Sequence, residues 1–410
     1  MEQNSGRLWP EGFIWGTGSS STQSEGAAQR SDWYHWERTG HAPVSGEGNG
    51  FSTRFAEDFA LLNQYSLRHY RLSFEWARIE PEEGTHDQAA IDHYRQMLLC
   101  AREHGIEIWG CLHHFSLPDW FARAGGFLKP DNRLRYWARH VDFIAKTFGD
   151  LVSGWQPVNE TNYYPTAAFL GRGWPPGHKD IGEWSLASQQ IQLASAEAAV
   201  RLKQTGLPVA SIFGLSTLHL LDDSDQSKEF SEFFYAANWS AGLKLFREGE
   251  LHIPGREPQS HPELAGAFDL IGFSFYCTFG VEQGKLVPYP PAAPQSPLGY
   301  SIWPEGLGLV LERLHRELPD TPLLIAEYGI GTADDSERED YLERGLEITY
   351  QALQDGMDIR GFLHWTAVDN YEWLHGFDVQ FGLIDSARRP KKSISILARE
   401  ARKTVSRHTG

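Results

Sequence analysis

Short apolar runs alternate with amphipathic stretches along most of the chain. Several of the runs are nearly continuous in apolar residues, which is typical of strands buried on both faces of a parallel sheet. They lie at residues 13–17, 69–74, 106–114, 152–160, 209–216, 268–276, 322–327 and 360–366. The pattern therefore predicts eight buried strands.

The stretches between these runs predict helices, because their apolar residues recur at steps of three and four or because they are rich in alanine. The clearest are 52–66, 131–150, 187–206 and 336–356. Glycine provides a stop signal near the end of the last three. The last one begins with Ser336 and carries Glu339 three residues later, which predicts a capping box at its start.

Strands that alternate with helices eight times predict an α/β fold of the (β/α)8 TIM-barrel type. Neither an internal repeat nor a long linker interrupts the alternation. The Pro-rich segment 289–299 lies between the sixth and seventh strands, so we expect an ordered loop over the barrel mouth. We interpret residues 1–410 as a single domain.

Composition narrows the choice of partner and compartment. The 410 residues carry a net charge of −17, which argues against nucleic acid or an anionic membrane as a partner. The chain start lacks a basic region followed by an apolar run, and no stretch reaches the length of a membrane span. Three cysteines without a C-x-x-C pair predict reduced thiols and a cytoplasmic location: Cys100, Cys111 and Cys277.

Two glutamates stand at the ends of predicted strands. Glu160 closes the fourth run and Glu327 closes the seventh, so both would lie at the barrel mouth, where the active sites of TIM barrels are built. Two facing carboxylates suit glycoside hydrolysis, in which one protonates the leaving oxygen and the other stabilises or attacks the anomeric carbon. The alternative is that each is an exposed residue or an arginine partner.

Several motifs resemble glycoside hydrolase family 1, the retaining β-glycosidases, over nearly the whole length. They are "FIWGTGSSSTQSEG", "YRLSFEWARIEPEEG", "LHHFSLPDW", "QPVNET", "AEYG", and "DGMDIRGFLHWTAVDNYEW" followed by "GFDVQFGLID". The resemblance implies that Glu327 is the nucleophile and Glu160 the acid/base. It further implies that Arg71 and Tyr276 flank the nucleophile and that the sugar is held by Gln23, His114, Asn159, Trp365, Glu372, Trp373 and Phe381.

The resemblance implies no metal and no cofactor. The adjacent histidines His113 and His114 could suggest a metal site, but no H-E-x-x-H or Cys/His spacing accompanies them. We therefore expect metal-free catalysis on a small carbohydrate substrate.

Five positions depart from the family pattern. Thr161 stands in place of Pro, Tyr328 and Ser274 in place of Asn, Phe115 in place of Trp, and Glu75 in place of a small residue. All leave both carboxylates intact. We hypothesise that Ser274 and Tyr328, which flank the nucleophile, change how the aglycone or the incoming water is held.

The expected protein is a cytoplasmic retaining β-glycosidase, best interpreted as a β-glucosidase acting on short oligosaccharides or small glycosides. The intact pair Glu372–Trp373 favours an unphosphorylated sugar, because a carboxylate would repel a 6-phosphate. Glucose, galactose and fucose all remain open as the sugar, and so does the oligomeric state. The alternatives are a transglycosidase and a sugar-binding protein that has lost catalysis.

Overall fold

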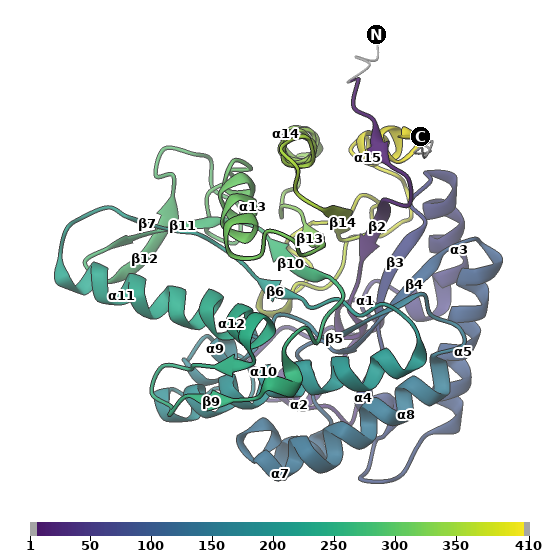
Figure 1. Ribbon diagram of the computed structural model, residues 1–410. Helices are drawn as coiled ribbons and strands as arrows, with labels where there is room; N and C mark the ends of the chain where they lie inside the picture. Colours follow the sequence, from purple (N-terminus) through teal and green to yellow (C-terminus); the bar gives the residue numbers. More distant parts are fainter. Residues whose placement is uncertain (1–5, 406–410) are drawn as a thin grey trace.

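Eight parallel strands form the central sheet of the computed structural model, which describes residues 6–405 (Figure 1). Their order is β5-β4-β3-β2-β14-β13-β10-β6. The bounds are β2 (Ile14–Gly18), β3 (His69–Ser73), β4 (Glu107–His113), β5 (Gly154–Val158), β6 (Phe213–Gly214), β10 (Ile271–Phe275), β13 (Leu323–Tyr328) and β14 (Ile359–Trp365). All eight predicted strands are present, although only two residues of the run 209–216 form a regular strand.

The two edges of the sheet meet, so the sheet curls into a (β/α)8 barrel. A parallel bridge joins Trp155 of β5 to Val209, just ahead of β6, and a second one joins Ala210 to Leu270, just ahead of β10. Every residue of β5, β10 and β13 is buried, as their apolar runs predict. The predicted fold class is confirmed.

Helices surround the barrel, and all four predicted helices are found. The longer ones are α3 (Phe51–Gln64), α5 (Gln88–Glu103), α8 (Ala138–Phe148), α10 (Ile181–Leu202), α13 (Gly306–Glu317) and α14 (Asp335–Gln354). The shorter elements are α1 (Ser21–Glu25), α2 (Asp32–Arg38), α4 (Trp76–Ile79), α6 (Asp119–Arg123), α7 (Pro130–Asn132), α9 (Tyr163–Phe169), α12 (Ala241–Glu248), α15 (Ile394–Ala401), β1 (Trp9–Pro10), β8 (Glu250–Leu251), β9 (Gln259–Ser260) and β15 (Thr404–Val405). Within residues 6–405, no helix has the length and apolar character needed to cross a membrane.

Two predicted helix starts are wrong, and both are set by aspartate caps. The helix predicted from residue 187 begins at Ile181, because the Asp180 side chain accepts a hydrogen bond from the Glu183 amide. The predicted capping box at Ser336 is absent. The Asp334 carboxylate instead accepts from the Ser336 amide at 2.9 Å, so α14 begins one residue earlier.

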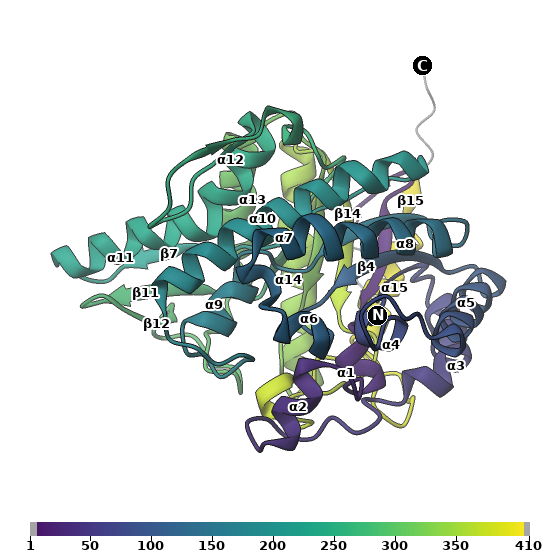
Figure 2. The ribbon, with the colours of Figure 1, turned by 90° about the horizontal axis from the view of Figure 1, so that it is seen from below.

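One part of the fold was not predicted. A lateral sheet of β7 (Leu218–Leu220), β11 (Thr278–Glu282) and β12 (Lys285–Tyr289) projects from one side of the barrel together with α11 (Asp225–Tyr235), as Figures 1 and 2 show. Phe234 of α11 packs against Leu218 and Val281 of this sheet. These segments follow β6 and β10, so they extend the barrel at the edge where strands end.

Candidate active site

A cavity of about 800 Å³ opens at the carboxyl ends of the barrel strands. All the predicted site residues line it except Arg71, which is fully buried beside it. The lining members are Gln23, His114, Asn159, Glu160, Tyr276, Glu327, Trp365, Glu372, Trp373 and Phe381. The fold therefore gathers residues that are up to 358 positions apart in the sequence (381 − 23).

Glu327 is held from two sides. Arg71 of β3 forms an ion pair with one carboxylate oxygen, and the hydroxyl of Tyr276, which follows β10, donates a hydrogen bond to the other. Burial and the neighbouring Glu327 carboxylate raise the pKa of Tyr276 well above its ordinary value, so this phenol remains a donor. These two contacts fix the orientation of the Glu327 carboxylate in the cavity.

Glu160 occupies a different environment on the opposite side. It follows β5 with a φ of 42°, and a β-carbon at Gly214 would lie only 3.2 Å from its carboxylate. Glycine at the end of β6 thus makes room for this side chain. Burial, and secondly the charge of Glu327, raise the pKa of Glu160 to about 8. At neutral pH this carboxyl group therefore retains its proton.

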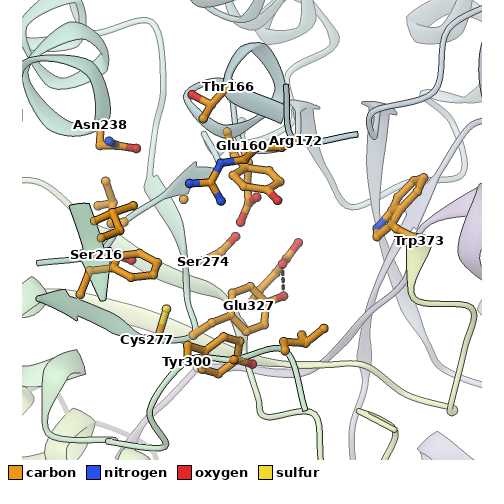
Figure 3. A pocket seen from close by; sticks show the side chains of 18 of the residues that line it. Glu160, Thr166, Arg172, Ser216, Asn238, Ser274, Cys277, Tyr300, Glu327 and Trp373 are labelled. Carbon is orange, nitrogen blue, oxygen red and sulfur yellow. Dashed lines mark hydrogen bonds between the residues drawn. The ribbon is translucent and has the colours of Figure 1, made fainter. Parts of the chain in front are cut away.

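Ser274 lies between the two carboxylates (Figure 3). In the strand register it is next to Glu327 on one side and next to Gly214, which faces Glu160, on the other. Its hydroxyl is buried and makes no well-aligned hydrogen bond to a described residue. Ser274 is therefore placed to affect whatever binds between the two glutamates.

A polar patch forms the next part of the wall. Gln23 of α1 donates from Nε2 to a Glu372 oxygen at 3.0 Å and to the Tyr371 carbonyl at 2.9 Å. Burial, with the charge of Glu327 as the second cause, raises the pKa of Glu372 to about 8. Donors and acceptors so arranged suit a ligand with several hydroxyl groups.

Aromatic rings flank this polar patch. The His114 ring stacks on Trp365 with centroids 5.6 Å apart, and on Trp373 at 6.2 Å. Burial and Arg71 hold the pKa of His114 well below its usual range, so its imidazole is neutral. Flat rings beside hydroxyl-binding groups match the alternating apolar and polar faces of a pyranose.

The hypothesis that Tyr328 influences the ligand is wrong. Its side chain points away from the cavity, toward α14, where its hydroxyl donates to the Tyr341 carbonyl at 2.8 Å. Alternate residues of a strand face opposite sides, so the neighbour of Glu327 must turn outward. Glu75 is also removed from the ligand, since it is buried and accepts from the Ser21 hydroxyl at 2.8 Å. Phe115 and Ser274 do line the cavity.

The two adjacent histidines, His113 and His114, have different surroundings. His114 lines the cavity, whereas His113 packs against Phe127, Trp137 and Tyr164. In the part of the chain that the structure describes, no group of three or more His, Cys, Asp or Glu side chains is arranged to hold a metal ion.

Much of the cavity wall was not predicted. Apolar residues of α11 and the lateral sheet line it, and so do Arg172 and Trp174 from the loop after α9. The aromatics of α11 carry only the pattern of a core-facing helix, so no sequence signal marks them as lining residues. The Pro-rich segment 289–299 contributes Leu298 and Gly299, which agrees with the predicted loop at the mouth.

Comparison with known proteins settles the family. The sequence model of glycosyl hydrolase family 1 matches residues 5–245 and 257–405. The chain belongs to glycosyl hydrolase family 1. With this membership, the enzyme is a glycoside hydrolase of the β-glycosidase type, and a carbohydrate is its class of substrate.

Relatives in glycosyl hydrolase family 1 have several specificities. Beta-glucosidase A of Thermotoga maritima is 24% identical over 92% of this chain and 93% of its own. A bifunctional beta-D-glucosidase/beta-D-fucosidase of Bifidobacterium breve is 26% identical over 94% of this chain and 96% of its own. A beta-galactosidase of Sulfolobus acidocaldarius is 27% identical over 92% of this chain and 90% of its own.

Solved structures agree with the barrel. The beta-glycosidase from Pyrococcus horikoshii superposes with a TM-score of 0.85 at 26% identity and covers 97% of this chain and 95% of that chain. The family 1 β-glucosidase from Thermotoga maritima gives a TM-score of 0.88 at 22% identity, covering 98% and 100%, and shows the shared fold.

Proposed function

We propose that this enzyme is a retaining β-glycosidase that acts as a β-glucosidase on terminal, unphosphorylated β-linked sugars of short oligosaccharides or small glycosides. The observation that carries the proposal is the contrast between the two glutamates. Glu327 is paired with Arg71 and Tyr276, whereas Glu160, in the same cavity, is buried with a raised pKa. Two carboxyl groups with opposite protonation are the requirement of double displacement.

In the first step, the Glu160 carboxyl group gives its proton to the glycosidic oxygen. A Glu327 oxygen attacks the anomeric carbon, the bond to the leaving alcohol breaks, and a glycosyl ester of Glu327 forms. The charge on Glu327 disappears in this ester, so the pKa of Glu160 falls. Glu160 then accepts a proton from water, which attacks the anomeric carbon and releases the sugar with its original configuration.

The sugar would lie between the polar patch and the rings. Glu372 and Gln23 bind hydroxyls, Asn159 reaches the 2-hydroxyl, and Trp365 forms the platform, while His114, Trp373 and Phe381 enclose the ring. Glu372 offers no positive charge to a phosphate group there, and its ionised form would repel one. The names of the relatives support glucose first, with fucose and galactose as competitors.

Residues 1–410 would form one catalytic domain that needs no cofactor. A cytoplasmic location is consistent with the cysteines, since Cys100, Cys111 and Cys277 are all unpaired.

The test is hydrolysis of a panel of 4-nitrophenyl β-glycosides: glucoside, galactoside, fucoside, mannoside, xyloside and glucoside 6-phosphate. We expect the glucoside to have the highest kcat/KM and Glu327→Ala to lower it about a thousandfold or more. Glu103→Ala, on the exposed face of α5, is the matched control and should retain full activity. A Glu327→Ala variant as active as wild type would refute the proposal.

A further inference from the structure

The cavity has two chemically different halves. The half around Glu327 carries nearly all of the polar side chains described above. The other half is walled by half-buried apolar residues of α11, the helical segment 236–240 after it and the β11–β12 hairpin. We call these residues the apolar wall: Phe230, Phe233, Ala237, Phe279, Leu286, Val287 and Pro288.

Two polar side chains near the apolar wall, Asn238 and Thr166, already have partners. The Asn238 amide donates to the Phe234 carbonyl at 3.0 Å and accepts from Asn162 Nδ2 at 3.2 Å. The Thr166 hydroxyl donates to the Asn162 carbonyl at 3.2 Å and accepts from Trp184 Nε1 at 3.1 Å. These two side chains therefore leave few donors and acceptors for additional hydroxyl groups of a ligand, and Arg172 is the charged donor that lines the cavity.

The apolar wall is part of a packed unit. Phe230, Phe279 and Leu286 pack against the buried cluster of Leu218, Phe234 and Val281, which joins α11 to the lateral sheet. Phe233 packs on Trp184 of α10 with ring centroids 5.0 Å apart. A subsite supported from behind in this way is formed before the ligand arrives.

We propose that the apolar wall is the subsite for an aromatic, apolar aglycone and that it discriminates against a second sugar. This inference rests on the proposed function, because an aglycone exists only if the sugar lies beside Glu160 and Glu327. A second sugar would bring several hydroxyls against Phe230, Phe233 and Phe279, where each unpaired group loses its hydrogen bonds to water. An aromatic group loses little and gains ring contacts.

Three substrates with the preferred sugar test the inference: the phenyl glycoside, the 4-biphenylyl glycoside and the β-linked disaccharide. The added phenyl ring hardly alters the acidity of the leaving phenol, so a difference between the two aryl substrates reports contact with the enzyme. We expect KM to be about tenfold lower for the biphenylyl glycoside, with similar kcat. The disaccharide should have the lowest kcat/KM.

Two wall variants and one control identify the contact. Phe233→Ala should reduce the biphenylyl preference to about twofold or less. Val287→Thr, at a half-buried position of β12, nearly keeps the side-chain shape and should also weaken the preference. Phe246→Ala removes a half-buried ring of α12 that packs on Phe268 outside the cavity, and should leave the preference intact.

The outcomes separate this inference from the proposed function. Hydrolysis of all three substrates with equal KM for the aryl pair, or with the disaccharide preferred, would overturn the aglycone subsite alone. A preference that persists in both wall variants would also overturn it. Failure of wild type to hydrolyse any of them, with no difference from Glu327→Ala, would refute the proposed function itself.

Discussion

Ser274 of β10 is the strand neighbour of Glu327 on β13, and its small side chain faces the cavity between the two glutamates. Glycosyl hydrolase family 1 usually has Asn at this position. We expect Ser274→Asn to fill space beside the Glu327 ester and to alter the access of water relative to that of an acceptor alcohol. The ratio of transfer to hydrolysis should change by about threefold or more.

Product analysis with added methanol measures that ratio. Ser301→Asn is the control, because Ser301 is a buried serine that does not line the cavity. An unchanged ratio in a well-folded Ser274→Asn variant would show that Ser274 has no part in partitioning.

Tyr328 faces away from the cavity, so we expect its substitution to change stability and not ligand binding. Its hydroxyl bonds to Tyr341 outside the barrel, so Tyr328→Phe should lower the free energy of unfolding by about 1 kcal/mol and leave KM unchanged. Tyr328→Asn should lower the free energy of unfolding by about 3–5 kcal/mol, because it leaves a cavity in a fully buried aromatic cluster. Urea denaturation measures both values. A changed sugar preference in Tyr328→Phe would contradict the outward orientation.

The raised pKa of Glu160 predicts the alkaline limb of the pH profile. The general acid must be protonated, and its pKa is about 8, so kcat/KM for phenyl glycosides should fall as the pH rises through about 8. In Glu160→Gln that limb should disappear. Activity should then survive best on 2,4-dinitrophenyl glycosides, whose leaving group needs no proton. An unchanged alkaline limb in Glu160→Gln would assign it to another group.

Arg172 is the single Lys or Arg side chain among the described residues that line the cavity (Figure 3). Its guanidinium should attract an aglycone with a carboxylate. Arg172→Gln should therefore reduce kcat/KM for a 4-carboxyphenyl glycoside by about two- to fivefold relative to the neutral phenyl glycoside, and salt should remove this difference. Equal effects on both substrates would indicate a structural role instead.

The sequence alone was sufficient for the barrel and for bringing the predicted residues around Glu327 into one cavity. Nearly continuous apolar runs such as 322–327 mark strands buried on both faces, and a barrel brings their ends to one mouth. The positions of Glu160 and Glu327 at two such strand ends therefore predict that they face each other. The family resemblance implied that Arg71 and Tyr276 flank Glu327, as the structure shows. The burial that raises the pKa of Glu160 depends on tertiary packing and could not be predicted.

The apolar wall of the cavity could not be predicted. The strands β11 and β12 are short and lie beside a Pro-rich segment, so the run 278–289 gives no strong strand signal. Apolar residues on α11 have the same periodicity whether they face a core or a ligand. Tyr328 was misplaced because proximity in sequence to Glu327 says nothing of the strand face, which alternates at every residue.

Trapping of the covalent intermediate tests double displacement at Glu327 most directly. The enzyme is incubated with a 2,4-dinitrophenyl 2-deoxy-2-fluoro-β-glucoside, whose fluorine slows breakdown of the glycosyl ester, and its peptides are analysed by mass spectrometry. We expect one fluoroglucosyl group, attached to Glu327. Turnover of the parent glucoside without any adduct, and with release of the α-anomer, would contradict it.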